Sequence, residues 1–123
     1  MHKRIQSFKY AFRGIKSTFG KEPNLNIHLV MAVLVVLCGV LFQINTAEWM
    51  ACLLCFGLVI AIEMLNTAIE LLVDLVSPEH HKKAGQIKDI AAGAVLVSAI
   101  AAAIVGLVIF VPKGLALISL LFI

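Results

Sequence analysis

The chain has 123 residues, enough for one domain, and 62% of them are hydrophobic. A mean hydropathy of +1.05 exceeds what the core of a soluble domain of this size needs, which argues against a soluble globular protein and indicates a membrane-embedded one. The formal net charge of +3 is too small to indicate a nucleic-acid partner, and none is expected.

Residues 1–21 predict an amphipathic helix that lies on the membrane surface. Hydrophobic residues recur at spacings of three and four, which places them on one face of a helix. Basic residues flank that face, as in helices that lie among lipid headgroups. The hydrophobic face consists of Ile5, Phe8, Phe12, Ile15 and Phe19, and its basic flank of Lys9, Arg13 and Lys16. The alternative interpretation is an ordinary packed helix.

Three membrane helices are predicted after this segment, at residues 26–44, 47–76 and 87–111. The first is just long enough, at about 1.5 Å per residue, to cross a hydrocarbon core of about 30 Å. The second is too long for the core alone, so its end projects toward the headgroups. The third is expected to stop at Pro112, since proline lacks the N–H that a helix needs. Residues 112–123 then form an apolar tail that is too short to span.

A very short polar turn is expected between the first two spans. Asn45 or Thr46 can cap the second helix, because a short polar side chain accepts a hydrogen bond from the free N–H groups of the first turn. Trp49 follows within the first turn, at the depth where an aromatic anchor meets the membrane–water interface. The turn therefore marks a membrane boundary.

The distribution of basic residues predicts the orientation of the spans. Every Lys and Arg except Lys113 falls on one side of the predicted spans, and this side is cytoplasmic by the positive-inside rule. We therefore expect a multi-pass protein of the bacterial cytoplasmic, or inner, membrane. The third span is rich in Gly and Ala, which permit close contact between helices, so a homo-oligomer is expected.

Four polar residues form a stripe along the second span. Glu63, Asn66, Glu70 and Asp74 are spaced by three, four and four residues, which places all of them on one helical face. An ionisable group at membrane depth costs roughly 2.5 to 3.5 kcal/mol, so such a stripe requires partners, metal or water. The alternative is a purely structural polar contact between helices.

Further charged residues are expected at the same membrane level. Lys88 and Asp89 stand at the cytoplasmic start of the third span, and Glu22 lies at the mouth of the first. Carboxylates can hold Mg²⁺, lysine can pair with phosphate, and a lipid hydroxyl meets cytosolic ATP at this boundary. The predicted reaction class is therefore phosphoryl transfer from ATP to a membrane lipid, with the active site facing the cytoplasm.

Two runs of sequence carry a resemblance to a known family. Residues 63–74 (EMLNTAIELLVD) and 88–95 (KDIAAGAV) resemble the signature of the prokaryotic diacylglycerol kinases, and the similarity extends from the YAFRG segment at Tyr10 through Glu22-Pro-Asn to His28 and on through the third span. The resemblance implies an all-α homotrimer with one surface helix and three membrane spans per subunit. It also implies transfer of the γ-phosphate of ATP to diacylglycerol or undecaprenol.

The resemblance also implies a role for each site residue. Glu63 corresponds to the general base that takes the proton from the lipid hydroxyl, while Glu22 and Glu70 hold Mg²⁺ on the nucleotide. Asn66 supports the base, and Asp74 lies in the active-site stripe. The residues implied to lie around ATP are Tyr10, Glu79, His81, Lys88 and Asp89. Lys3 stands where the family has an arginine that helps bind the nucleotide, and lysine cannot make the bidentate phosphate contact of arginine.

Two questions stay open at this stage. The first is whether the chain is instead a non-catalytic membrane protein, such as a cation channel or an assembly factor. The acids other than Glu48 gather at or near the cytoplasmic boundary rather than along the depth of the membrane, which favours the kinase over a channel. The second is the lipid, although residues 22–28 resemble the undecaprenol-phosphorylating members more closely.

Overall fold

The computed structural model describes residues 2–20, 22–79 and 81–123, and these residues form four α-helices joined by short connections. Residues 1 and 21, at the two ends of the predicted surface helix, lie outside the described residues. The helices are α1 (His2–Thr18), α2 (Pro23–Leu41), α3 (Thr46–Val76) and α4 (Lys82–Leu121).

Among the described residues, α2, α3 and α4 are the three helices long and apolar enough to cross a membrane. The prediction of an all-α chain with three helices that could span a membrane is therefore confirmed. Many large apolar side chains point outward, such as Leu53 and Leu75, which are 72% and 80% exposed. A single chain thus leaves most of its apolar surface for lipid or for other subunits to cover.

α2 begins and ends three residues earlier than the predicted range of 26–44. Pro23 occupies its first turn, where the missing N–H of proline costs nothing. Its last turn closes when the Ile44 N–H donates to the Gly39 carbonyl at 3.1 Å, and Gln43 takes a left-handed conformation with φ of 51°. Since a left-handed residue cannot continue a right-handed helix, α2 ends before it.

α3 begins with the cap that the sequence predicts. Asn45 is the N-cap residue, and its side chain accepts from the Glu48 N–H at 2.8 Å. The Glu48 carboxylate in turn accepts from the Asn45 N–H at 3.0 Å, which completes a reciprocal capping box. Of the two candidate caps, Asn45 is therefore the one used.

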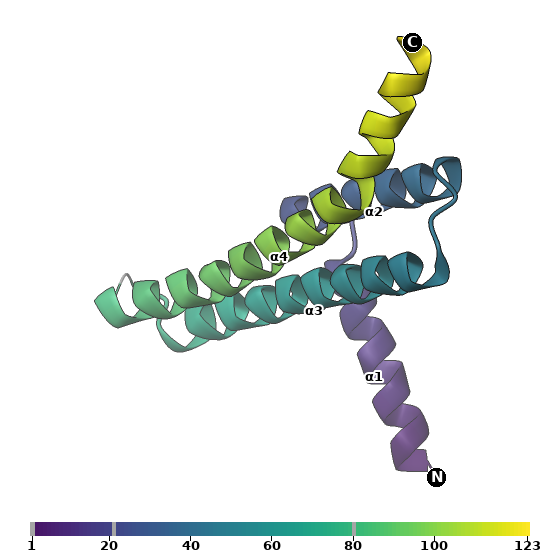
Figure 1. Cartoon of the computed structure of the whole chain (residues 1–123). Coiled ribbons are helices and arrows are strands. Elements are labelled where there is room, and N and C mark those ends of the chain that lie inside the picture. Colours follow the sequence, from purple (N-terminus) through teal and green to yellow (C-terminus); the bar gives the residue numbers. More distant parts are fainter. Residues whose placement is uncertain (1, 21, 80) are drawn as a thin grey trace.

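α4 corrects the prediction that the third span runs over 87–111 and stops at Pro112. The helix begins at Lys82 and continues through Pro112 to Leu121, and its yellow C-terminal part turns away from the direction of the rest (Figure 1). Proline removes one hydrogen bond and bends a helix. An open end in an apolar environment would leave several backbone groups unpaired, so a bent helix costs less than a terminated one. The predicted apolar tail is thus the bent end of α4.

α3 is the central helix of the fold, with α4 running antiparallel beside it and α2 against it (Figure 1). At the end where α3 begins, Glu48 Oε2 pairs with Lys113 Nζ at 3.4 Å. The Trp49 ring lies directly on Gly39 of α2, so closely that a Cβ there would come within 2.5 Å of it. These contacts join the three helices at the end opposite to the acidic stripe.

Candidate active site

Glu63 is the most deeply buried charged residue of those that the structure describes, with 2% of its surface exposed. Its Oε2 atom has no hydrogen-bond partner among the described residues. His28 of α2 approaches it, with 3.7 Å between His28 Nε2 and Glu63 Oε2. Thr67 donates to the Glu63 carbonyl at 3.1 Å, which satisfies the Thr67 hydroxyl inside its own helix. A buried carboxylate with a free oxygen can accept a proton from a substrate that reaches it.

Asn66 and Glu70 extend the site toward the end of α3. Asn66 is 7% exposed, and its Nδ2 atom donates to Glu70 Oε1 at 3.4 Å. The amide therefore contacts Glu70, and the support of Glu63 by Asn66 stays a prediction. Asn66 Oδ1 is a second buried oxygen without a partner in the described part of the chain.

Glu22 joins this group from the first span. It is the N-cap residue of α2, is partly buried, and its side chain makes no capping hydrogen bond. Glu22 stands at the start of α2, whereas Glu63 and Glu70 lie in the second half of α3, so the three acids lie toward one end of the helix bundle. The fold thus unites residues that stand more than forty positions apart in the sequence.

Asp74 and Lys88 form an ion pair between α3 and α4. The two residues are among those predicted for the site, and both are partly or largely exposed, at 62% for Asp74 and 38% for Lys88. An exposed ion pair contributes about 1 kcal/mol or less to stability. The pair therefore holds Lys88 beside the acidic stripe and costs little to open.

Four other predicted nucleotide residues face solvent or make local contacts. The Tyr10 hydroxyl donates to Gln6 Oε1 at 3.1 Å within α1. The Glu79 carbonyl accepts from Ser77, and Asp89 is exposed. His81 is the N-cap of α4, where its Nδ1 atom accepts from the Lys83 N–H at 3.2 Å. Their contacts with ATP stay predictions.

The oxygen ligands at this end of the bundle suit Mg²⁺. Mg²⁺ prefers oxygen and is commonly held by one or two carboxylates together with substrate phosphates and water. No group of three metal-ligating His, Cys, Asp or Glu side chains exists within residues 2–20, 22–79 and 81–123. Glu22 and Glu70, with the free Oδ1 of Asn66 nearby, therefore fit an ion that phosphate oxygens help to hold, and do not form a complete protein cage.

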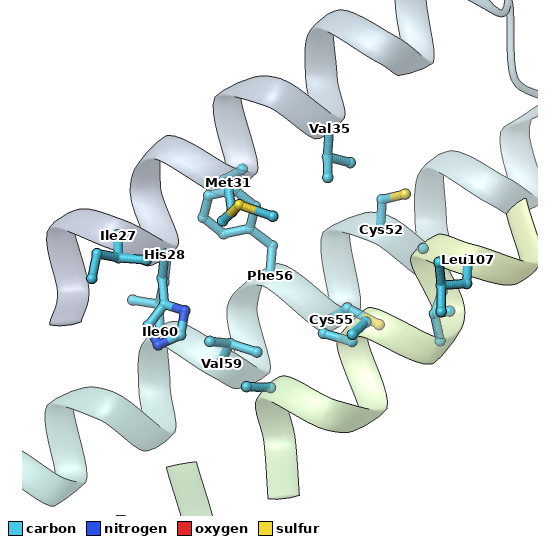
Figure 2. A pocket seen from close by; sticks show the side chains of 16 residues that line it. Ile27, His28, Met31, Val35, Cys52, Cys55, Phe56, Val59, Ile60 and Leu107 are labelled. Atoms are coloured by element: carbon cyan, nitrogen blue, oxygen red, sulfur yellow. The ribbon is translucent and has the colours of Figure 1, made fainter. Parts of the chain in front are cut away.

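A cavity of about 540 Å³ opens between α2, α3 and α4 next to His28. Figure 2 shows Met31 and Val35 of α2, Phe56 of α3 and Leu107 of α4 around this common space. His28 borders the cavity and also lies 3.7 Å from Glu63. His28 is therefore the residue that connects the wall of the cavity with Glu63.

Sequence reasoning missed two roles that the structure reveals. His28 carried no assigned role, yet it is the residue that links α2 to Glu63. The available signal was its position, because an ionisable residue inside an apolar span is a functional hypothesis by default. His81 was assigned to ATP alone, whereas it also caps α4.

Comparison with known proteins shows which family the chain resembles. Residues 9–110 match the family model described as prokaryotic diacylglycerol kinase. The chain is 43% identical over 113 residues to the undecaprenol kinase of Bacillus subtilis, covering 92% of each protein. It is 40% identical over 114 residues to a diacylglycerol kinase of Synechocystis, covering 92% of this chain and 65% of that protein. The diacylglycerol kinase of Escherichia coli K12 is 28% identical over 100 residues, or 81% of this chain and 82% of that protein.

Proposed function

The chain belongs to the prokaryotic diacylglycerol kinase family and is a lipid kinase, and we propose that it transfers the γ-phosphate of ATP, with Mg²⁺, to the terminal hydroxyl of undecaprenol or diacylglycerol. The observation that carries this proposal is the environment of Glu63. Its carboxylate is buried, has an oxygen without a hydrogen-bond partner among the described residues, and lies 3.7 Å from His28, which lines an apolar cavity. A lipid hydroxyl and a nucleotide can meet at such a point.

Glu63 acts as the general base. Its Oε2 atom takes the proton from the lipid hydroxyl while the hydroxyl oxygen attacks the γ-phosphorus, and ADP leaves with the electron pair of the broken P–O bond. His28, at 3.7 Å from Oε2, holds the carboxylate in position from α2. Burial of Glu63 keeps water away from the attacking oxygen, so that the phosphate goes to lipid rather than to water.

Glu22 and Glu70 hold Mg²⁺ on the nucleotide. When bound there, Mg²⁺ would supply positive charge that neutralises the phosphates and helps to orient them. Asn66 fixes Glu70 through its hydrogen bond, and Lys88 approaches a phosphate oxygen from α4. Placing metal and base on one helical face gives the two substrates a common meeting point.

Two further features support the proposed homotrimer and its orientation in the membrane. Side chains of α4 such as Ala101 are exposed, and a Cβ at Gly93 would contact nothing within 4 Å. Small residues on an outward face let helices of two subunits pack closely, which supports the homotrimer that the family resemblance implies. The excess of Lys and Arg beside the acidic end supports an active site on the cytoplasmic side of the inner membrane, with α1 lying on its surface as an amphipathic helix.

The decisive experiment is transfer of radiolabelled γ-phosphate from ATP by the purified, detergent-solubilised protein, with diacylglycerol and undecaprenol in parallel mixed micelles. We expect labelled lipid, and a fall of about 100-fold or more in turnover for Glu63→Gln, since general base catalysis contributes on that order. Helical content and ATP binding should be retained in this variant. Near-normal turnover of Glu63→Gln would show that Glu63 is not the general base. Absence of label in both lipids would favour the non-catalytic alternative.

A further inference from the structure

The tail, residues 112–123, is apolar on every side of its helix. Successive helical residues are turned by about 100°, so neighbouring side chains point in different directions. The large apolar side chains of the tail are nevertheless all exposed, and they are Leu115, Leu117, Ile118, Leu120, Leu121 and Phe122. After Gly114, Ser119 carries the one polar side chain up to Ile123. A helix without a polar face requires apolar surroundings on all sides.

Pro112 stands where the hydrocarbon core of a membrane would end. Residues 90–111 precede it without a charged side chain, and at about 1.5 Å per residue they extend roughly 33 Å, close to the core thickness of about 30 Å. Lys113 Nζ pairs with Glu48 Oε2 at 3.4 Å, and Trp49 follows Glu48 directly. Charged and aromatic residues of this kind mark the membrane–water boundary. A straight continuation of α4 would therefore carry the apolar tail into water.

α4 bends at this boundary instead. Its last part leaves the common direction of α3 and α4 and runs across it (Figure 1). Because that common direction crosses the membrane, a segment that runs across it lies along the membrane plane. α1 also runs across the bundle (Figure 1), but it carries a basic flank that lipid headgroups can solvate. The tail has no such flank after Lys113, so its place is deeper, among acyl chains.

The tail leaves an open crevice between itself and α2. Just before the bend, Phe110 of α4 lies against Phe42 at the end of α2, with 6.2 Å between the ring centroids. Beyond this contact a crevice of about 360 Å³ opens, and its lining residues are Leu41, Phe42, Lys113, Ala116, Leu117 and Leu120. All of them except Lys113 are apolar. Acyl chains therefore suit this crevice better than water does.

We propose that the tail is an in-plane membrane anchor whose partner is lipid. It lies among the acyl chains just below the headgroups of the leaflet at the end of the bundle opposite to the acidic stripe, and acyl chains fill the crevice beside α2. A neighbouring subunit would cover one side of the tail and leave its other apolar sides in water, so lipid is the better partner. The tail follows residues 9–110, which match the family model, and the anchor is thus separate from the proposed kinase reaction.

The first test measures how accessible the tail is to water. Single cysteines are placed on four sides of the helix in the full-length protein, which is reconstituted in vesicles of phosphatidylcholine and phosphatidylglycerol with a membrane-impermeant maleimide on both sides. The variants are Ile118→Cys, Ser119→Cys, Leu120→Cys and Leu121→Cys, with Ala47→Cys at the exposed start of α3 as the water-facing control. We expect all four to be labelled at least about tenfold more slowly than the control, since an apolar environment keeps the thiol protonated.

The pattern of labelling separates the possible surroundings of the tail. Labelling of all four positions as fast as the control would show a tail in water and overturn the proposal. Slow labelling on one side of the helix and fast labelling on the others would show a tail docked on a protein surface, which would overturn it as well. The wild type, with Cys38, Cys52 and Cys55 inside the spans, gives the background.

The second test measures the depth of the tail in lipid. Phe122→Trp adds an indole to the single tryptophan of the chain, Trp49, and the vesicles contain lipids brominated either near the headgroup end or near the methyl end of the acyl chain. After subtraction of the wild-type signal, we expect the added emission to be quenched mainly by the shallow bromine, because an in-plane helix lies within about 5 to 10 Å of the headgroups. Absence of quenching, or stronger quenching by the deep bromine, would overturn the proposal. Neither test measures catalysis, so both outcomes are independent of the kinase reaction.

Discussion

His28 Nε2 lies 3.7 Å from Oε2 of Glu63, so a histidine near the start of α2 reaches the buried carboxylate in α3. The two residues stand 35 positions apart in the sequence, and the contact forms only when the helices pack. It divides the molecule into an apolar cavity on one side and a group of acids on the other. In the reaction proposed above, the lipid would arrive from the side of the cavity and the nucleotide from the side of the acids.

Removing His28 should affect turnover more than nucleotide binding. In His28→Ala the Glu63 carboxylate loses the side chain that approaches it from α2, and we expect kcat for lipid phosphorylation to fall about tenfold, which corresponds to a loss of about 1.4 kcal/mol of transition-state stabilisation. His28→Gln keeps an N–H donor of similar reach and should recover part of the activity. The measurement is kcat and KM for both substrates, with thermal unfolding as the control for folding. Equal kcat in the wild type and His28→Ala would argue against a positioning role.

Substituting Glu22 or Glu70 should change the response to Mg²⁺. Loss of a carboxylate ligand weakens a hard-cation site, so we expect Glu22→Gln and Glu70→Gln each to raise the Mg²⁺ concentration for half-maximal activity about tenfold. The measurement is a Mg²⁺ titration at saturating ATP.

The matched control for this titration is Glu48→Gln at the opposite end of α3. Glutamine keeps the capping box with Asn45, so this variant removes a carboxylate without uncapping the helix. Its Mg²⁺ response should equal that of the wild type. If Glu22→Gln and Glu70→Gln both kept the wild-type Mg²⁺ requirement, neither residue would be a metal ligand.

The close approach of α2 and α3 depends on Gly39. A Cβ at this position would lie 2.5 Å from the Trp49 ring, so Gly39→Ala forces the helices apart, and overpacking of this kind costs about 1 to 3 kcal/mol. Gly57→Ala is the control, because a Cβ there meets nothing within 4 Å. Thermal unfolding in detergent should show a lower midpoint for Gly39→Ala alone. Equal midpoints for the two variants would mean that the contact is not tight in the membrane protein.

The helices and the polar stripe could be read from the sequence because they depend on local periodicity. Apolar runs of sufficient length predict spans whatever surrounds them, and a spacing of three and four fixes Glu63, Asn66 and Glu70 on one face of any helix. The cap at Asn45 is equally local. The predicted homotrimer, the surface position of α1 and the ATP contacts of Tyr10, Glu79, His81 and Asp89 remain predictions.

Tertiary structure alone decided which residues of different helices meet. The approach of His28 to Glu63, the ion pair of Asp74 with Lys88 and the apolar cavity all require side chains from separate helices, and no spacing within one helix encodes their distance. Local sequence patterns also failed to predict that α4 continues through Pro112. In water a proline commonly ends a helix, whereas an apolar environment penalises open backbone groups and favours a bend. The sequence by itself determined the spans and the chemical character of the site, and packing determined its geometry.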